Sequence, residues 1–217
     1  MPRHLQRDLD NLSKELLTMG AMVEDATNKA VLALSQRRTD LAQEVVLGDD
    51  AINEKENRIE EECLKVLALY QPVATDLRFI VTAMKVNNDL ERIGDLAVNI
   101  AERANWLAEL DPIPLPESLN KLVSNVQAMV RDSLNSLVNM DSQLARNVCD
   151  VDDEVDDINR RMFTEMQDLM KKDPSMVERA ISTLSVSRHL ERIADLATNI
   201  AEDVIFLVEG EIVRHNL

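Results

Sequence analysis

The sequence predicts an all-α protein built from two tandem antiparallel three-helix bundles that are related by pseudo-two-fold symmetry. Composition is one reason: aromatic residues make up 2% of the chain, which has 4 glycines and 6 prolines, whereas strands favour aromatic residues and hairpins favour glycine turns. An internal repeat is the other, because LERIGDLAVNIAE at 90–102 returns as LERIADLATNIAE at 190–202. A repeat with so long a period indicates two similar domains and not a short-repeat solenoid.

The first half is expected to contain three helices, at residues 7–36, 40–70 and 75–107. Polar residues 37–39 end the first helix, and Gln71-Pro72 end the second because proline interrupts helical hydrogen bonding. In the third helix, apolar residues recur at alternating spacings of three and four, as they do on the buried face of a bundle helix. This core stripe comprises Leu90, Ile93, Ala97, Ile100, Ala104 and Leu107.

The second half is expected to repeat this plan, with helices at 117–140 and 142–171 and a third that begins at Asp173-Pro174. Short turns make neighbouring helices antiparallel, so each half forms an up-down-up bundle. The proline-rich segment 111–116 is the linker between a domain of residues 1–110 and one of residues 117–217. The core stripe returns as Leu190, Ile193, Ala197, Ile200, Val204 and Leu207.

The formal net charge of −16 disfavours nucleic-acid binding, because recognition of phosphates needs a basic face. An acidic surface suits metal cations or the basic surface of a partner protein. The first ten residues have no apolar leader core, and the chain has no run of about 18 apolar residues, so we expect neither signal peptide nor membrane span. Cys63 and Cys149 are isolated, as thiols are in a reducing compartment. The protein is therefore expected to be cytoplasmic.

Oxygen-bearing side chains recur four residues apart in the second and third helices of each half. This spacing places the two members of a pair on one helix face, about 5–6 Å apart. If the helices fold back at the turn between them, the two pairs of each half lie level with one another. The candidate metal ligands are Asp49, Asn53, Glu91 and Asp95 in the first half and Asp152, Asp156, Glu191 and Asp195 in the second.

Carboxylates gathered in this way repel one another unless a cation neutralises them. We predict divalent or trivalent metal ions (Mg, Mn, Fe or Zn), and oxygen-only ligands favour the harder of these cations over zinc. The pairs point away from the core stripe, so each site is expected in an open groove between two helices. The second site should bind metal more tightly, because it has four carboxylates where the first has three and the amide of Asn53.

Five segments carry a known pattern: Met19–Glu24, Gly48–Asn53, Gln71–Arg78, LERIGD at 90–95 and LERIAD at 190–195. In these segments the chain resembles the PhoU family of cytoplasmic regulators of phosphate uptake, and the resemblance covers nearly all of its length. It implies two three-helix bundles whose acidic motifs bind metal ions at the surface. It also implies repression of phosphate-starvation signalling, through the phosphate-specific ABC transporter and a sensor histidine kinase.

Two residues depart from the family pattern: Asn53 stands in place of a carboxylate, and Ala194 in place of the glycine of the second signature. Arg92 and Arg192 follow the first glutamate of each signature and are predicted to contact a partner. His189 is expected to be an exposed side chain and not a ligand, because Asp89 takes its place in the other half.

The leading interpretation is a non-catalytic, homodimeric regulator that binds metal. By the resemblance, its partners are the ATPase of the phosphate ABC transporter and a phosphate-sensing histidine kinase. One alternative is a metal-dependent hydrolase or oxidase that uses the carboxylate clusters, and another is a helical adaptor without metal. We predict that the protein is not an enzyme, because the sequence has no P-loop, no nucleophile elbow and no cysteine–histidine pairing.

Overall fold

Six α-helices and one short 3₁₀ turn make up most of residues 3–210, the part of the chain that this computed structural model describes, and none of those residues forms a strand. The all-α prediction is thus confirmed. Within the same residues, no helix combines the length and the apolar character that crossing a membrane requires. The outer ends of the two predicted domains, residues 1–2 and 211–217, lie outside the described residues. The elements are α1 (Arg3–Gln36), α2 (Thr39–Tyr70), α3 (Ala74–Ala108), α4 (Glu117–Asn139), α5 (Ser142–Lys172), η1 (Pro174–Met176) and α6 (Val177–Glu209).

Aspartate side chains cap the start of α5 and of the 3₁₀ turn η1. The carboxylate of Asp141 accepts hydrogen bonds from two backbone N–H groups in the first turn of α5, each at 3.0 Å. The carboxylate of Asp173 accepts one from Ser175 N at 2.9 Å. The sequence places the start of the sixth helix at Asp173-Pro174, but there Asp173 caps the 3₁₀ turn η1, and α6 begins only at Val177.

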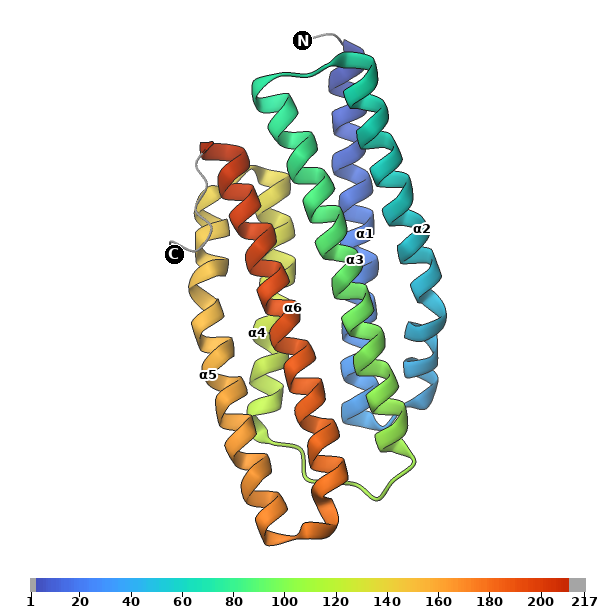
Figure 1. Ribbon diagram of the computed structural model, residues 1–217, viewed down its shortest axis with the longest axis vertical. Helices are drawn as coiled ribbons and strands as arrows, with labels where there is room; N and C mark the ends of the chain where they lie inside the picture. The colour runs from blue at the N-terminus through green and yellow to red at the C-terminus, as the bar shows by residue number, and fades with distance from the viewer. Residues whose placement is uncertain (1–2, 211–217) are drawn as a thin grey trace.

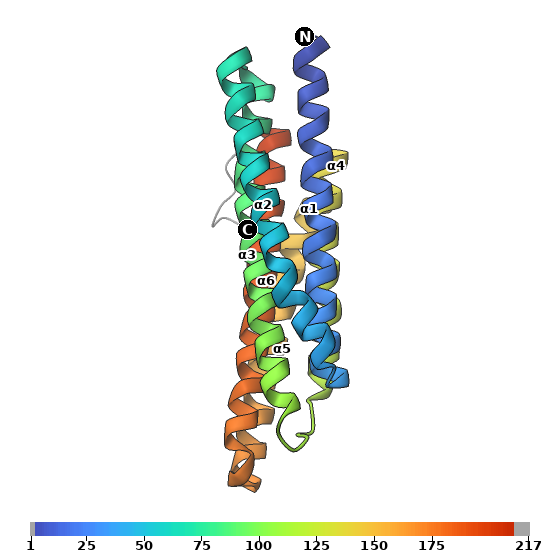
Figure 2. The same ribbon diagram turned by 90° about the vertical axis from the view of Figure 1, so that its right-hand side faces the viewer.

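The six helices lie in two layers. In Figure 1, α5, α6, α3 and α2 lie side by side on the near face, with α4 and α1 behind them, and Figure 2 shows the thin edge of this arrangement. Within each half every helix contacts the other two, and the halves meet along α3–α6 and α1–α4. The α2–α3 turn and the α5–α6 turn lie at opposite ends of the molecule, and α3 and α6 run in opposite directions. This is the predicted pseudo-two-fold relation between two three-helix bundles.

The repeated helices α3 and α6 supply the centre of the core. Every residue of the two predicted stripes is buried, and Ile93 and Ile193 have no exposed surface. In the second contact between the halves, Gly20 of α1 packs against Leu134 of α4: a Cβ atom added at Gly20 would lie 2.5 Å from Leu134 Cδ1, so the leucine side chain would have to shift.

Polar contacts also join the halves. Lys85 Nζ of α3 lies 2.8 Å from Asp203 Oδ1 of α6, and the same ammonium group lies 5.7 Å from the centre of the Phe206 ring. Asp203 is almost completely buried, so its charge needs such a partner. At the linker, Arg179 Nη1 of α6 donates a hydrogen bond of 3.0 Å to the carbonyl oxygen of Asp111. Together these contacts supplement the apolar packing of one half on the other.

Replacing Ile93 or Ile193 with alanine is expected to lower the free energy of unfolding by about 2–5 kcal/mol, because each change leaves a cavity at a fully buried position. Chemical denaturation of the purified variants measures this loss. Ile181→Ala is the matched control: this isoleucine also lies on α6 but is 56% exposed, so its truncation should change stability by less than about 0.5 kcal/mol. Equal losses in the core and control variants would contradict the packing described.

Candidate functional site

The first acidic cluster lies between α2 and α3. Asp49 and Asn53 extend from α2, and Glu91 and Asp95 extend from α3; Asp95 is exposed and the other three are half-buried. Asn53 Nδ2 donates a hydrogen bond of 3.1 Å to Asp49 Oδ2. The other carboxylate oxygen of Asp49, Oδ1, and the amide oxygen of Asn53, Oδ1, are both buried without a hydrogen-bond partner. Buried oxygens of this kind are normally satisfied by an ion or by water.

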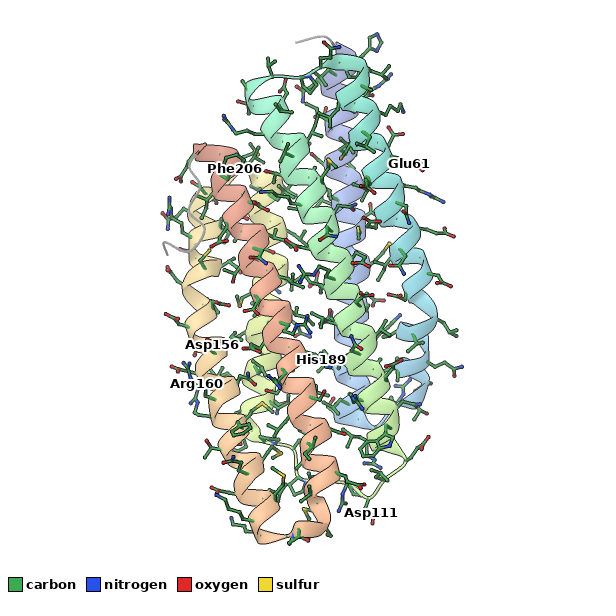
Figure 3. The ribbon with its side chains drawn as sticks, in the orientation of Figure 1. Glu61, Asp111, Asp156, Arg160, His189 and Phe206 are labelled. Atoms are coloured by element: carbon green, nitrogen blue, oxygen red, sulfur yellow. The ribbon has the colours of Figure 1, made fainter. Side chains whose placement is uncertain are left out.

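The second acidic cluster repeats the arrangement between α5 and α6. The hydroxyl of Thr198 donates a hydrogen bond of 3.3 Å to Asp152 Oδ1. Val98 occupies the matching position of the first half, so this hydrogen bond has no equivalent there. Figure 3 shows Asp156 on the side of α5 that faces α6. The cluster comprises Asp152, Asp156, Glu191 and Asp195, of which Asp195 is the most exposed but is still partly covered.

Burial and mutual repulsion raise the pKa of carboxyls in both clusters. Burial is the largest cause in every case, and the next raising contributions come from neighbouring carboxylates. Asp95 is the strongest such neighbour of Asp49, and Asp195 is that of Asp152, which are the residues that the sequence register places opposite each other. The carboxyls with a raised pKa are Asp49, Glu91, Asp152, Glu191 and Asp195.

The chemistry of these side chains fits a hard cation. Carboxylate and amide oxygens are its preferred ligands, and two such oxygens of the first cluster lack a partner. As the side chains stand, however, no group of three or more His, Cys, Asp or Glu residues among those described converges closely enough to hold a metal ion. Binding would require the side chains of a cluster to move closer together. Metal ligation at these residues therefore stays a prediction.

The one difference between the two signatures, Gly94 against Ala194, has a packing explanation. A Cβ atom added at Gly94 would lie 3.3 Å from both Cδ1 and Cγ2 of Ile52. The residue that corresponds to Ile52 in the second half is Val155, which is buried and lacks the Cδ1 methyl group. The smaller valine makes room for the methyl group of Ala194, so the helices of both halves can approach to the same degree.

A polar groove between α3 and α6 connects the two halves. From the sequence, the acidic clusters are predicted to be separate sites in separate helical hairpins. The structure places one residue of each, Asp95 and Asp195, in this same groove. Arg92 and Arg192, the predicted partner-binding residues, are exposed along it, and Arg92 Nη1 lies 3.4 Å from Asp89 Oδ1. The groove is lined by matching residues from the two repeats: Arg92, Asp95, Leu96, Asn99, Arg192, Asp195, Leu196 and Asn199.

His189 is half-buried, so the expectation that it is exposed was wrong. Figure 3 shows it on α6 near the centre of the molecule. Its Nδ1 has no hydrogen-bond partner, and its Nε2 lies 3.4 Å from the hydroxyl of Ser185. Burial lowers the pKa of its imidazole, and the charges of nearby arginines, chiefly Arg192, lower it further. The imidazole is therefore neutral at pH 7.

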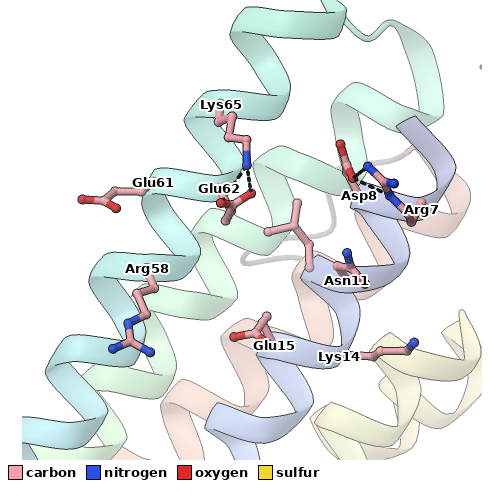
Figure 4. Close-up of a pocket in the computed structure, with 10 residues that line it drawn as sticks. Arg7, Asp8, Asn11, Lys14, Glu15, Arg58, Glu61, Glu62 and Lys65 are labelled. Atoms are coloured by element: carbon pink, nitrogen blue, oxygen red, sulfur yellow. Dashed lines mark hydrogen bonds and ion pairs between the residues drawn. The ribbon is translucent and has the colours of Figure 1, made fainter. Parts of the chain in front are cut away.

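A further charged hollow lies between the start of α1 and the second half of α2 (Figure 4). It is lined by four basic and four acidic side chains. Arg7 pairs with Asp8 at 3.3 Å, and Lys65 pairs with Glu62 at 2.9 Å, while Glu61 points away from the hollow in Figure 4. Because its charges balance and several pair with each other, this hollow has no net charge that would attract an ionic ligand.

Comparisons with known proteins give a consistent result. The family model of the PhoU domain matches residues 16–104 and again residues 119–204. A phosphate-specific transport system accessory protein PhoU homolog of Aquifex aeolicus is 42% identical over 97% of this chain and 96% of its own length, and one of Pseudomonas putida is 41% identical over 96% and 82%. The crystal structure of PhoU from Pseudomonas aeruginosa superposes with a TM-score of 0.92 at 40% identity, covering 95% of this chain and 99% of that one.

In chelator-treated protein, Asp152→Asn is expected to raise the melting temperature at pH 7, because it removes a half-buried charge that its neighbours repel. Folding raises the pKa of Asp152 above its ordinary value of 3.8, so its destabilising effect is complete at neutral pH and is lost as the pH falls through the raised value. The advantage of the variant should therefore shrink on acidification toward pH 4. Thermal unfolding across this range measures the effect. Asp153→Asn, at the exposed neighbouring position, is the control, and an equal gain in that variant would contradict the explanation.

Proposed function

The chain belongs to the PhoU family, and we propose that it is a cytoplasmic regulator that restrains phosphate uptake and represses phosphate-starvation signalling when phosphate is plentiful. The observation that supports this most strongly is the match of both halves to the PhoU domain, together with relatives named as accessory proteins of phosphate-specific transport. The proposed partners are the ATPase of the phosphate ABC transporter and a phosphate-sensing histidine kinase. We further propose that the protein works as a homodimer.

Metal ions (Mg, Mn, Fe or Zn) are proposed to bind at the two acidic clusters. Asp49, Glu91 and Asp95, with the amide oxygen of Asn53, would hold an ion in the first. The four carboxylates of the second cluster would hold another. A bound cation would neutralise carboxylates whose pKa values are raised by burial and by one another, and would so stabilise the face on which both clusters lie.

Regulation through protein contacts, without catalysis, is the mechanism that we propose. The acidic clusters and the arginines of the central groove lie on one open face, so a partner's surface could cover them together. Free phosphate, by contrast, would be repelled by a chain of net charge −16. We therefore infer that phosphate status reaches this protein through the transporter and is not sensed by a pocket within it.

Titration of the metal-free protein with Mn²⁺ is expected to show two classes of site, with the tighter one at the second cluster. Affinity for a hard cation rises with the number of charged ligands, and the first cluster has the amide of Asn53 in place of a carboxylate. Asp195→Asn should therefore remove the tighter binding event and Asp95→Asn the weaker one, as measured by calorimetry. Asp157→Asn, at an exposed position beside the second cluster, should leave both unchanged. If neither cluster variant alters metal content, the clusters are only a solvated acidic face.

Deleting the gene is expected to leave phosphate-starvation genes switched on in phosphate-rich medium, as read from a reporter. Arg92→Glu and Arg192→Glu should each copy part of this effect, because they reverse the charge that the groove presents to a partner. Both positions are exposed, so circular dichroism should show an intact fold. Arg58→Glu, at an exposed position of α2 outside the groove, serves as the control. Normal repression in the deletion strain, or efficient turnover of phosphoesters by the purified protein, would contradict the proposal.

A further inference from the structure

A second groove, of about 680 Å³, opens between α5 and α6 on the side toward the turn that joins them. It includes none of the carboxylates of the acidic clusters. Its floor is apolar: Phe163 of α5 is 53% exposed and Ile181 of α6 is 56% exposed, with the half-buried Leu184 beside them. Two guanidinium groups, of Arg160 and Arg188, stand at its rim. Figure 3 shows Arg160 on the outer side of α5.

Because the chain contains an internal repeat, the residues of this groove can be compared with those at the matching positions of the first half. Alignment of the acidic pairs relates α5 to α2 by 103 positions, and alignment of the signatures relates α6 to α3 by 100. The two halves share a backbone plan, yet the first half is polar or acidic where the second is aromatic or basic. Three positions change in this way: Arg160, Phe163 and Arg188 correspond to Asn57, Glu60 and Asn88. The three-helix bundle therefore does not itself require an aromatic or basic residue at these places.

The exposed apolar surface also has no role in the core. Phe163 is one of only 3 phenylalanines in the chain, and it lies half in solvent beside the fully buried Met162. An exposed apolar patch with a polar rim is typical of a surface that contacts another molecule. Arg160 is available to such a molecule, since its ion pair among residues 3–210 is with the exposed Asp157 of its own helix, and a surface pair of this kind is readily exchanged. Arg188 is exposed.

We propose that this groove binds an amphipathic helix of a partner protein, one that covers Phe163 and Ile181 with an apolar side chain and pairs carboxylates with Arg160 and Arg188. A groove between two packed helices suits a helix laid along it, with apolar anchors at helical spacing. The basic rim selects an acidic partner, because opposite charges steer encounter and fix orientation. This goes beyond the proposed function, since it requires neither bound metal nor a component of phosphate transport.

Other occupants suit the groove less well. Anionic lipid surfaces are recognised by clusters of about 4–8 basic residues, so a membrane is a poor match for a groove that is lined by only two arginines. A second copy of this chain could offer acidic residues together with the exposed Leu64 of α2. That contact would join unlike surfaces and would not close on itself as a two-fold dimer does.

The test uses the full-length protein and a fluorescent synthetic helix of roughly 18 residues, long enough to hold a helical conformation. One face of the peptide carries leucines flanked by glutamates, and a control peptide carries lysines in place of the glutamates. Fluorescence anisotropy should show binding of the acidic peptide only. Phe163→Glu and Arg188→Glu should each weaken it at least about tenfold, as expected for an anchor and a paired charge at the centre of an interface. Arg58→Glu, an equal change of charge on exposed α2, should leave it unchanged.

Equal binding of the two peptides, no binding of either, or full affinity in Phe163→Glu would overturn the proposal. Self-association that sedimentation shows to be abolished by Phe163→Glu would assign the groove to a second copy and overturn it too. So would Phe163-dependent binding to vesicles of phosphatidylcholine and phosphatidylglycerol. Thermal unfolding checks the fold of each variant, and Phe163→Ser provides a neutral replacement should the glutamate variant not fold. None of these outcomes bears on repression of phosphate-starvation genes in the deletion strain, so the two proposals fail separately.

Discussion

The packing of α3 against α6 is the interaction on which the rest of the structure depends. Each of these helices contacts the other two helices of its own half as well as its counterpart across the pseudo-two-fold axis. Three of its sides are thereby covered, and the repeated apolar stripes from Leu90 to Leu107 and from Leu190 to Leu207 are buried in full. Each of the two helices then has one uncovered side, and the polar residues of the duplicated motif lie there. Duplication of one helix thus brings Asp95 and Asp195, one residue of each acidic cluster, into a single groove.

This arrangement sets core packing against electrostatic repulsion, and the core is the stronger effect. One fully buried isoleucine such as Ile93 contributes about 2–5 kcal/mol relative to alanine. A pair of like charges on a helix surface costs only about 0.2–0.5 kcal/mol. The backbone therefore keeps Asp49 near Asp95 and Asp152 near Asp195, although burial, with repulsion added to it, raises the pKa of Asp49 and of Asp152. The fold cannot relieve this repulsion by moving the carboxylates apart, but a bound cation would relieve it by neutralising their charge.

The features that could be predicted from the sequence are those that depend on the spacing of residues close together along the chain. Apolar spacing gave the helices and their stripes, and counting outward from the turns gave the level of each acidic pair. No local pattern states which helices of the two halves meet, so the shared groove that contains Asp95 and Asp195 was not foreseen. The half-burial of His189 was also missed: α6 packs against α3, and Arg103 of α3, which is distant in sequence, is among the charges near its imidazole. Phe163 follows the buried Met162, and composition alone could not tell an exposed aromatic residue from a core one.

Residue differences between the two halves are of two kinds, those in the core and those on the surface. Inside, a change in one residue is matched by another: Ala194 replaces Gly94 where Val155 replaces Ile52, which preserves the approach of the helices. On the surface, Phe163 replaces Glu60, and because the side chain is exposed, packing requires no compensating change in the core. A compensated core keeps the backbone the same in both halves, and an exposed side chain is not constrained by packing. The surface of each half can therefore acquire its own ligands and partners while the acidic clusters keep their positions, because those positions depend on the buried stripes and not on the groove beside them.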